Sequence, residues 1–366
     1  MDLKFPRKLD LYIMKKFMAT FFIALLLIIG IVIIFDISEK VDDFVEHQVS
    51  IQSIIFDYYI NFIPYFMNMF SPLFVFITVI FFTSRLAANS EIIAILSCGV
   101  SFHRMMVPYI VSAFLIALLS LSLNLWVIPS ANRHRNEFEA KYIRYHDKST
   151  ASKNVHYQIS PGQFVYVDNF TKINNTAYKF SLETVKDNRL VSKLSAESAV
   201  WDSTMGGWKL RNYFIRDYAE NSIHDRVRTG EKLDTVISLT VTDFYRRKDT
   251  VENLELDELQ DFIDMQTMRG DANVQFSLVE WHTRFALPFS AFILTILGVS
   301  LSSRKRRGGI GWNLAAGIAL SFSYILFLKF SQMFVATGTL PPWFAIWMPN
   351  MIFAIIAAVL YRLAPK

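Results

Sequence analysis

The sequence predicts an α-helical membrane protein with six transmembrane helices, three before and three after an inserted all-β domain. Three long apolar segments occur early in the chain and three occur late. Between them lies a polar stretch of well over a hundred residues that alternates like β structure. This layout is typical of a chain that crosses a membrane several times and holds a folded domain on one side.

The composition fits a membrane protein rather than a soluble enzyme. The 366 residues are 53% hydrophobic and 19% charged, whereas soluble domains carry about 25% charged residues. The mean hydropathy is +0.31. The single cysteine, Cys98, excludes an internal disulfide and a cysteine-based metal site.

The sequence carries no pattern for catalysis. It contains neither a GxxxxGKS/T phosphate-binding loop nor a GxSxG nucleophile turn, and its histidines lack metal-ligand spacing. The glycines at 308, 309 and 311 follow a cationic run and fit a tight turn. We therefore expect a protein that is not an enzyme and uses no cofactor or metal. Its energy would come from a partner ATPase or an ion gradient.

Each apolar segment is long enough to cross a hydrocarbon core of roughly 30 Å at about 1.5 Å per residue. The first follows a basic start and has no small-residue cleavage site, so we expect an uncleaved membrane helix. The second contains Pro64 and Pro72, which we expect to break it. The predicted helices cover residues 17–35, 54–83, 105–128, 285–301, 310–335 and 343–361.

The distribution of Lys and Arg predicts the orientation. Arg85, Arg104 and the run at 304–307 fall on the same side as the basic N-terminus, whereas the short loops of the other side hold only Lys40 among several acids. Because cations concentrate on the cytoplasmic side, we expect both termini inside and the β domain outside. The formal net charge of +5 is then a topology signal, and we expect no nucleic-acid partner.

The insertion is predicted from strand and turn signals. Residues 163–168 and 234–241 are rich in β-branched and aromatic residues, and Met205-Gly206-Gly207 is a hairpin turn signal. The regular spacing favours a sandwich or jelly roll. Residues 254–268 return to helical periodicity, and Gly270 ends that helix. We divide the chain into residues 1–130 (first three helices), 131–252 (β-jelly-roll-like domain) and 253–366 (connecting helix and last three helices).

The most distinctive local feature is the cytoplasmic segment between the second and third helices. Asn89 or Ser90 can begin a short helix over residues 89–98, and Gly99 can end it. Ile92, Ile95 and Leu96 share one face. In one interpretation this apolar face inserts into a groove on a partner. In the other, Glu91 is only a favourable first-turn acid and the apolar face rests on lipid.

Several stretches resemble the LptF/LptG permease family of the lipopolysaccharide exporter. The run from Ser90-Glu91 to Ser97-Cys98-Gly99-Val100-Ser101 is similar to the coupling helix of that family. The resemblance spans nearly the whole chain, and its membrane motifs are fairly specific together and weak singly. Its further motifs here are LDLYI at 9–13, WHTRFALP at 281–288, GTLPP at 338–342 and WMPN at 347–350.

The resemblance implies a non-catalytic subunit in the inner membrane of a Gram-negative bacterium. Such a subunit pairs with a second permease of the family, binds a cytoplasmic ATP-binding-cassette (ABC) ATPase, and passes lipopolysaccharide to periplasmic bridge proteins. By residue match, Glu91 is the acid that faces the ATPase, with Ile92, Ile95 and Leu96 packed beside it and Gly99 closing the helix.

Substrate contacts are expected from cations near the outer surface. Family members carry cations at the outer end of the first helix, but this chain has Ile33-Ile34-Phe35-Asp36, so the charge is missing or displaced to Lys40. Lys329 lies roughly 28 Å along the fifth helix from Ile310 at 1.5 Å per residue, where it either reaches the headgroups or contacts substrate phosphates. The arginines after the third helix, Arg133, Arg135 and Arg144, either join this set or form a solvated face.

Two rival functions remain at this stage. A gradient-driven secondary transporter predicts ionisable residues near the bilayer midplane, and Lys329 sits too close to the surface for that role. A scaffold that anchors a periplasmic β domain needs only one helix, whereas this chain has six, with prolines at 64, 72 and 288.

Overall fold

The computed structural model describes residues 8–143, 152–171, 173–218, 225–241, 244, 251–271, 273–303 and 309–364. Contacts divide the chain into two units. The helical unit comprises Met1–Phe138, Glu252–Leu256 and Gln275–Lys366, and the β unit comprises Glu139–Val251 and Asp257–Val274.

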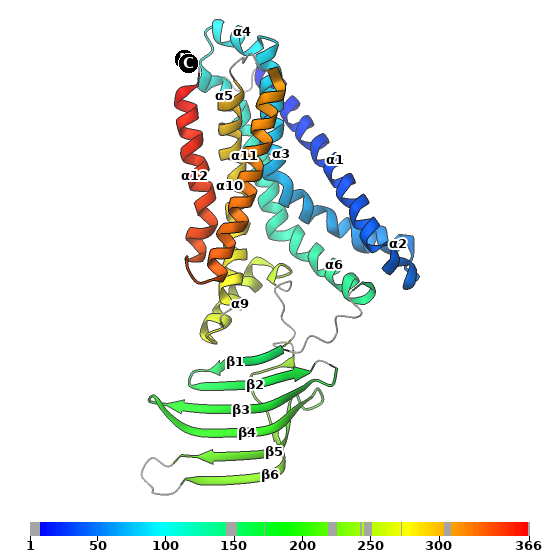
Figure 1. The fold of residues 1–366 in the computed structure, drawn as a ribbon, viewed down its shortest axis with the longest axis vertical. Helices are drawn as coiled ribbons and strands as arrows, with labels where there is room; N and C mark the ends of the chain where they lie inside the picture. Colours follow the sequence, from blue (N-terminus) through cyan, green and yellow to red (C-terminus); the bar gives the residue numbers. More distant parts are fainter. Residues whose placement is uncertain are drawn as a thin grey trace. The chain divides into compact units, whose positions relative to one another are not determined.

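Six helical stretches of the described chain are long and apolar enough to cross a membrane, three on each side of the β insertion, which confirms the predicted arrangement (Figure 1). A short helix, α4 (Glu91–Ser97), lies between the second and third stretches. The stretches are α1 (Lys8–Glu46), α2 with η1 and α3 (Ile51–Ser53, Ile54–Tyr59, Ile60–Ala88), α5 with η2 and α6 (Phe102–Ser122, Leu123–Val127, Ile128–Tyr142), α10 (Val274–Ser302), α11 (Gly309–Ala336) and α12 (Pro342–Leu363), where η1 and η2 are π-helical turns.

The helices are longer than their apolar cores, and the predicted break at two prolines is wrong. α1 covers 39 residues, because helical hydrogen bonding continues into the polar flanks on both sides of the apolar run. Pro64 and Pro72 both lie inside the continuous helix α3. Membrane helices tolerate proline when neighbouring helices, side chains or local adjustments satisfy the freed backbone groups.

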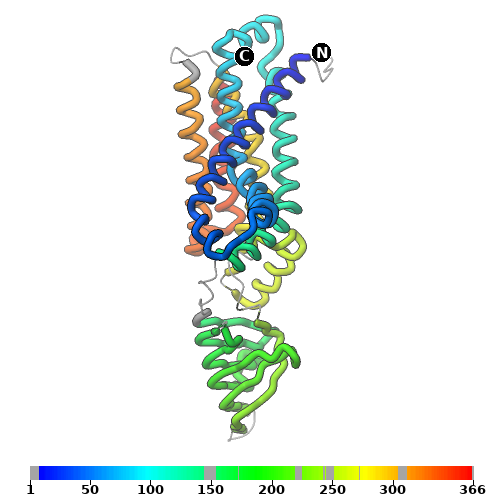
Figure 2. Tube along the Cα trace, turned by 90° about the vertical axis from the view of Figure 1, so that its right-hand side faces the viewer, coloured from blue at the N-terminus to red at the C-terminus, as the bar shows by residue number. Residues whose placement is uncertain are grey.

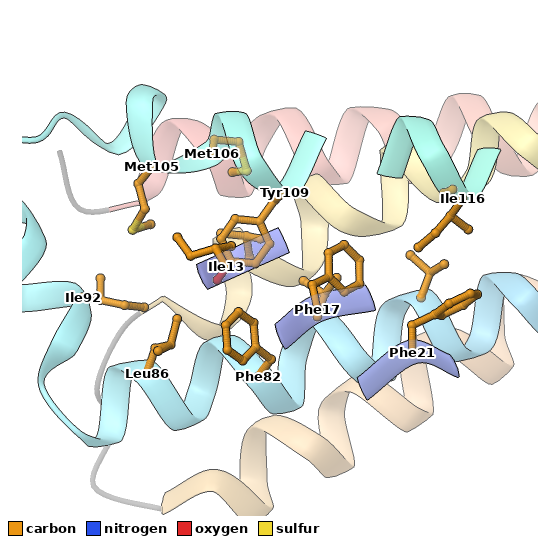
Figure 3. Close-up of a cluster of buried hydrophobic side chains, with 14 of the residues drawn as sticks. Ile13, Phe17, Phe21, Phe82, Leu86, Ile92, Met105, Met106, Tyr109 and Ile116 are labelled. Carbon is orange, nitrogen blue, oxygen red and sulfur yellow. The ribbon is translucent and has the colours of Figure 1, made fainter. Parts of the chain in front are cut away.

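One narrow stripe of α1 is buried, and the other faces of its central part are apolar but largely exposed. Ile13, Phe17, Phe21, Leu25 and Ile29 recur every four residues and are all buried. The first four of these pack against α3 and α5, where Phe82, Tyr109 and Ile116 belong to the same cluster (Figure 3). Exposed apolar side chains such as Leu26 and Leu27 cover the remaining surface. A helix that is apolar all round is typical of a membrane span.

Helices α3, α10 and α11 approach closely. A Cβ at Gly298 of α10 would stand 2.9 Å from Val79 Cγ1 of α3, so a glycine is needed at this contact. Hydrogen bonds add specificity within the apolar interior. Asn350 of α12 accepts a hydrogen bond from the Tyr324 hydroxyl at 2.9 Å and donates to the Ala286 carbonyl at 2.8 Å, which joins α10, α11 and α12.

The β unit contains one six-stranded antiparallel sheet with the strands in chain order (Figure 1). The strand predicted at 163–168 lies within β2, and the predicted hairpin turn joins β4 to β5 with Gly206 at φ +63°. The strand predicted at 234–241 is wrong, because pairing ends at Thr235. The strands are β1 (Ser152–Ser160), β2 (Gln163–Thr171), β3 (Thr176–Lys186), β4 (Arg189–Asp202), β5 (Gly207–Asp217) and β6 (Arg226–Thr235).

A polar row crosses the sheet at one register line. Asn154, Lys179 and Asn212, on alternate strands, adopt left-handed φ values of 53°, 50° and 50°. The buried positions switch at this line from odd to even residues in β2: Val165 and Val167 precede it and Phe170 follows it. Such irregularities bend strands. The sheet therefore curves around one apolar core that includes Phe180, Ala199, Trp208 and Leu210. The all-β insertion is confirmed, and its described strands form a bent meander.

Helix α9 (Leu256–Met268) completes the β unit and matches the predicted helical segment. It ends where expected, since Gly270 has φ +65° and the amide of Asp271 donates to the Gln266 carbonyl at 3.0 Å. The adjoining Arg269 carbonyl accepts a hydrogen bond from the amide of Gln158 in β1 at 3.2 Å.

Candidate functional site

Helix α4 is positioned by its two ends. Gly99 has φ +81° and ends the helix, as the sequence predicts. At the start, Ser90 occupies the capping position with φ +63° but makes no capping hydrogen bond from its side chain. Instead, the side-chain amide of Asn89 donates from Nδ2 to Glu91 Oε1 at 3.1 Å. This contact orients the Glu91 carboxylate in the first turn, where the helix dipole favours an acid.

The apolar face of α4 packs against the protein itself. Ile92 is 1% exposed and belongs to the cluster that α1, α3 and α5 share (Figure 3). Ile95 and Leu96 are partly buried against the same cluster. Ile92 is therefore unavailable to a partner or to lipid, whereas for the rest of this face insertion into a partner and contact with lipid stay the two predictions. The side chains that keep accessible surface are the half-buried Glu91, Ile95 and Leu96 and the exposed Ile93, Ala94 and Ser97.

An ion pair beside α4 joins two helices that are far apart in sequence. Arg104 of α5 donates two hydrogen bonds to Asp10 of α1, at 2.7 and 2.6 Å. The two side chains are 16% and 3% exposed. Paired guanidinium and carboxylate groups give geometric precision as well as energy. The pair fixes α1 to α5 next to the helix that carries Glu91.

A second contact ties the end of the chain to the same region. The start of α1 and the end of α12 lie at the α4 end of the helical unit (Figures 1 and 2). There, a hydrogen bond of 2.8 Å joins the Tyr361 hydroxyl to His103 Nδ1, and the Tyr361 ring packs against Phe102. The α4 end therefore connects α1, α3, α5 and α12.

The opposite end of α1 carries a compact polar network. Lys40 Nζ lies 2.8 Å from Asp36 Oδ1 and also donates to the Tyr58 hydroxyl. The hydroxyls of Tyr58 and Tyr59 donate to Asp36 at 3.2 and 3.1 Å. These adjacent tyrosines come from the π-helical turn η1, and both reach the same carboxylate. The Lys40 cation is therefore paired and mostly sheltered from solvent.

A family model described as "Lipopolysaccharide export system permease LptF/LptG" matches residues 11–363. The chain belongs to the LptF/LptG family. It is thus a multi-pass membrane protein and a permease of the lipopolysaccharide export system. LptF/LptG permeases are transmembrane subunits and not catalytic ones. No curated protein matches the chain.

The structure separates the cations that were predicted to meet substrate in this LptF/LptG chain. Lys329 of α11 is exposed and lies in one stripe with the exposed residues Leu326 and Met333. It makes no ion pair within the described residues. Lys40 is held by Asp36. The Lys329 charge is therefore accessible at the surface, whereas the Lys40 charge is paired with Asp36.

The arginines after the third span are engaged by protein groups. Arg133 donates to the Asn253 carbonyl at 3.4 Å, and the Arg135 guanidinium stacks over the Tyr65 ring with 5.0 Å to its centroid. These contacts favour a structural role for both. Arg144 lies outside the described residues.

Sequence reasoning on this LptF/LptG permease missed a buried arginine. Arg284 of α10 is 2% exposed, and its Nε donates to Glu280 Oε1 at 3.0 Å. Its backbone carbonyl accepts a 3.5 Å hydrogen bond from Asn124, which in turn accepts from Asn68 at 2.7 Å. The spacing of Glu280 and Arg284, four residues apart on one helix, was the available signal.

Proposed function

We propose that this permease is one of two family subunits that work with a cytoplasmic ABC ATPase to extract lipopolysaccharide from the inner membrane. In this proposal both termini and α4 lie in the cytoplasm, and the β unit lies in the periplasm. The Lys and Arg bias of the short loops supports that orientation. The cargo leaves through the β unit towards periplasmic bridge proteins.

One observation carries the coupling proposal: α4 presents Glu91 at its surface while Ile92 anchors it in the core of the helical unit. A partner that moves α4 must move Ile92 with it. Because Ile92 packs with α1, α3 and α5, the displacement passes directly to membrane-spanning helices. The contacts to the ATPase would come from Glu91, Ile93, Ala94 and Ser97, and Ile92, Ile95 and Leu96 would act as positioning residues.

The Asp10–Arg104 pair extends this connection to α1. Because it fixes α1 to α5 beside α4, a movement of α4 would tilt α1 rather than leave it behind. At its far end α1 carries Asp36 and Lys40. Such a tilt would change the space available to the lipid between the two permeases.

Two lysines are proposed to act on the anionic groups of the lipid in different ways. Lys329 is exposed in an apolar stripe of α11, so it can meet a phosphate without first losing an ion-pair partner among the described residues. Lys40 must exchange Asp36 for a phosphate. Arg133 and Arg135 have weaker support as lipid contacts, because protein groups already hold them.

The coupling proposal is tested with Glu91→Lys and a matched control, Glu91→Gln, in the complete exporter reconstituted in vesicles. Glu91→Lys reverses the charge at the surface of α4, and we expect lipopolysaccharide release to fall by about tenfold or more, since a hydrogen bond to a charged group contributes about 1.5–3 kcal/mol. Glu91→Gln keeps the side-chain length and should retain more activity.

ATP hydrolysis and release are measured together on the same vesicles. We expect hydrolysis to persist in Glu91→Lys while release is lost, and insertion of the chain in the membrane to be normal. Release at the unmodified rate by Glu91→Lys would rule out the coupling role of this residue.

A further inference from the structure

The third membrane stretch is one continuous helix that links the two ends of the helical unit. It runs over 41 residues, Phe102–Tyr142, through α5, η2 and α6, and its ends lie at opposite ends of the unit (Figure 1). At 1.5 Å per residue it is roughly 60 Å long, about twice the thickness of a hydrocarbon core of roughly 30 Å. At its α4 end it carries Arg104, which pairs with Asp10. The stretch can therefore carry a displacement from the α4 region to α6.

Helix α6 holds a piece of chain that comes back from the β unit. This return segment, residues 252–256, belongs to the helical unit, although the residues on both sides of it belong to the β unit. Asn132 of α6 donates from Nδ2 to the Glu252 carbonyl at 3.4 Å. Four residues further along, Asn136 donates from Nδ2 to Asn253 Oδ1 at 2.9 Å. Two asparagines on one face of α6 therefore hold two consecutive residues of the return segment.

The contact between α6 and the return segment is sheltered from water. The Asn132 side chain is fully buried, and Asn136 is half-buried. A buried amide is costly to leave without a hydrogen-bond partner. Because water does not reach Asn132 to replace the Glu252 carbonyl, separation of α6 from the return segment is unfavourable. The contact is thus suited to stay closed rather than to open and close during transport.

Other sides of α6 pack on two further parts of the helical unit. The centroid of the Phe138 ring lies 6.2 Å from that of Phe44 near the end of α1, and 5.2 Å from that of Tyr58 in η1. The Arg135 guanidinium stacks over the ring of Tyr65 in α3. A movement of α6 therefore involves the end of α1 and the start of α3, and it reaches the return segment through the two asparagines.

We propose that Asn132 and Asn136 are positioning residues that join the return segment to the third membrane stretch, so that both move as one body during export. The return segment leads directly into α9, which begins at Leu256. A displacement that starts at α4 thus reaches the β unit along the chain itself. This inference rests on the proposed function, because the displacement is the one that the ATPase is proposed to apply to α4.

The first test removes both side-chain donors. Asn132→Leu with Asn136→Leu keeps the branched shape of each side chain, and His134→Ala on the exposed part of α6 is the matched control. In the exporter reconstituted in vesicles, we expect the double variant to hydrolyse ATP at the unmodified rate but to release lipopolysaccharide several-fold more slowly. His134→Ala should match the unmodified protein in both rates. Unmodified release by the double variant would overturn the proposal, and an equal loss of hydrolysis and release would overturn the positioning role.

The second test restores the connection by other means. Asn136→Cys and Asn253→Cys are introduced with Asn132→Leu in a Cys98→Ser background, because Cys98 is the only cysteine and is exposed. A short cross-linker that a reductant can remove joins the two new thiols. We expect release to be slow before cross-linking, several-fold faster after it and slow again after reduction, while ATP hydrolysis stays constant. No recovery of release in the cross-linked protein would overturn the proposal.

Two further proteins separate this inference from the function on which it rests. With Asn132 unchanged, the cross-linked pair of Asn136→Cys and Asn253→Cys should release lipopolysaccharide at the unmodified rate, since the contact stays closed. A loss of release on cross-linking would show that the contact has to open, and would overturn the inference while leaving the proposed function intact. No release by the Cys98→Ser background would overturn the proposed function, and this inference with it.

Discussion

Ion pairs are arranged differently in the helical unit and in the β unit. In the helical unit, Asp10 and Arg104 stand 94 residues apart and are almost enclosed. In the β unit, pairs such as Asp168–Lys179 join adjacent strands, with side chains 34% and 76% exposed. The Asp10–Arg104 pair fixes distant segments to one another, whereas the Asp168–Lys179 pair adds to contacts that the sheet already makes.

The comparison shows that exposure to solvent determines how much an ion pair contributes to the stability of the fold. Exposed pairs are screened by water and typically contribute about 0–1 kcal/mol. A sheltered pair contributes little net energy over an apolar replacement, but removal of one partner leaves an uncompensated charge. Removal of one partner from the Asp10–Arg104 pair should therefore lower stability strongly. Replacement of both partners by uncharged residues should lower it much less.

The largest effect is expected at the inner pair. Arg104→Leu removes the guanidinium that pairs with the buried Asp10 carboxylate and should lower stability by about 3–5 kcal/mol. The double variant Arg104→Leu with Asp10→Asn removes both charges and should recover most of that loss. Thermal unfolding of the purified protein in detergent measures both, and equal destabilisation by the single and double variants would contradict this view of the pair.

A smaller effect is expected at the outer network. Lys40→Met removes the cation that donates to Asp36 and Tyr58, at a cost of about 1.5–3 kcal/mol for a hydrogen bond to a charged group. The Asp36 carboxylate keeps the hydroxyls of Tyr58 and Tyr59, which limits the loss. The same unfolding measurement applies, and a larger shift than that of Arg104→Leu would reverse the ranking.

The smallest effect is expected in the β unit and depends on pH. Hydrogen bonds from Lys209 and Thr204 lower the pKa of Asp202 from its ordinary value, and those from Ser192 and Arg228 lower the pKa of Asp217. A carboxyl group whose pKa is lower in the folded state stabilises it above the unfolded pKa, which is about 3.9. This stabilisation is lost as the pH falls through the folded pKa.

Tryptophan fluorescence of the unfolding transition, followed from pH 7 downward, checks this prediction. The midpoint should hold until about pH 4 and then decline, with a shallower decline in Asp202→Asn. Lys179→Gln should hardly change the midpoint at pH 7, because its pair is exposed. A decline that begins near neutral pH would point to other groups.

The six helices were predictable from the length and apolarity of their segments, and the β insertion from its alternation and turn residues. The contacts between elements were not. Residues 234–241 alternate like a strand, yet it is only their side chains Ile237, Leu239 and Val241 that pack into the bent sheet. In contrast, β6 (Arg226–Thr235) is rich in charge and carries no strand pattern. Alternation reports which residues are buried, and it does not report whether the backbone is paired.

The candidate site shows the same limit. The sequence located α4 and its end at Gly99 from local signals. It could not show that Ile92 faces inward, since that depends on where α1, α3 and α5 lie. It likewise could not pair Lys40 with Tyr58 or Asp10 with Arg104, because folding brings these residues together across 18 and 94 positions.

Helix α4 has seven residues, and isolated helices shorter than about 12–15 residues are marginal in water. It therefore owes its shape to Ile92 and its neighbours rather than to its own hydrogen bonds. When α4 is displaced it cannot unwind one turn at a time, because a still shorter helix would not be stable. The helix would either transmit the whole displacement or detach from the core, so the proposed link between an ATPase and the membrane helices would have two states, attached and detached.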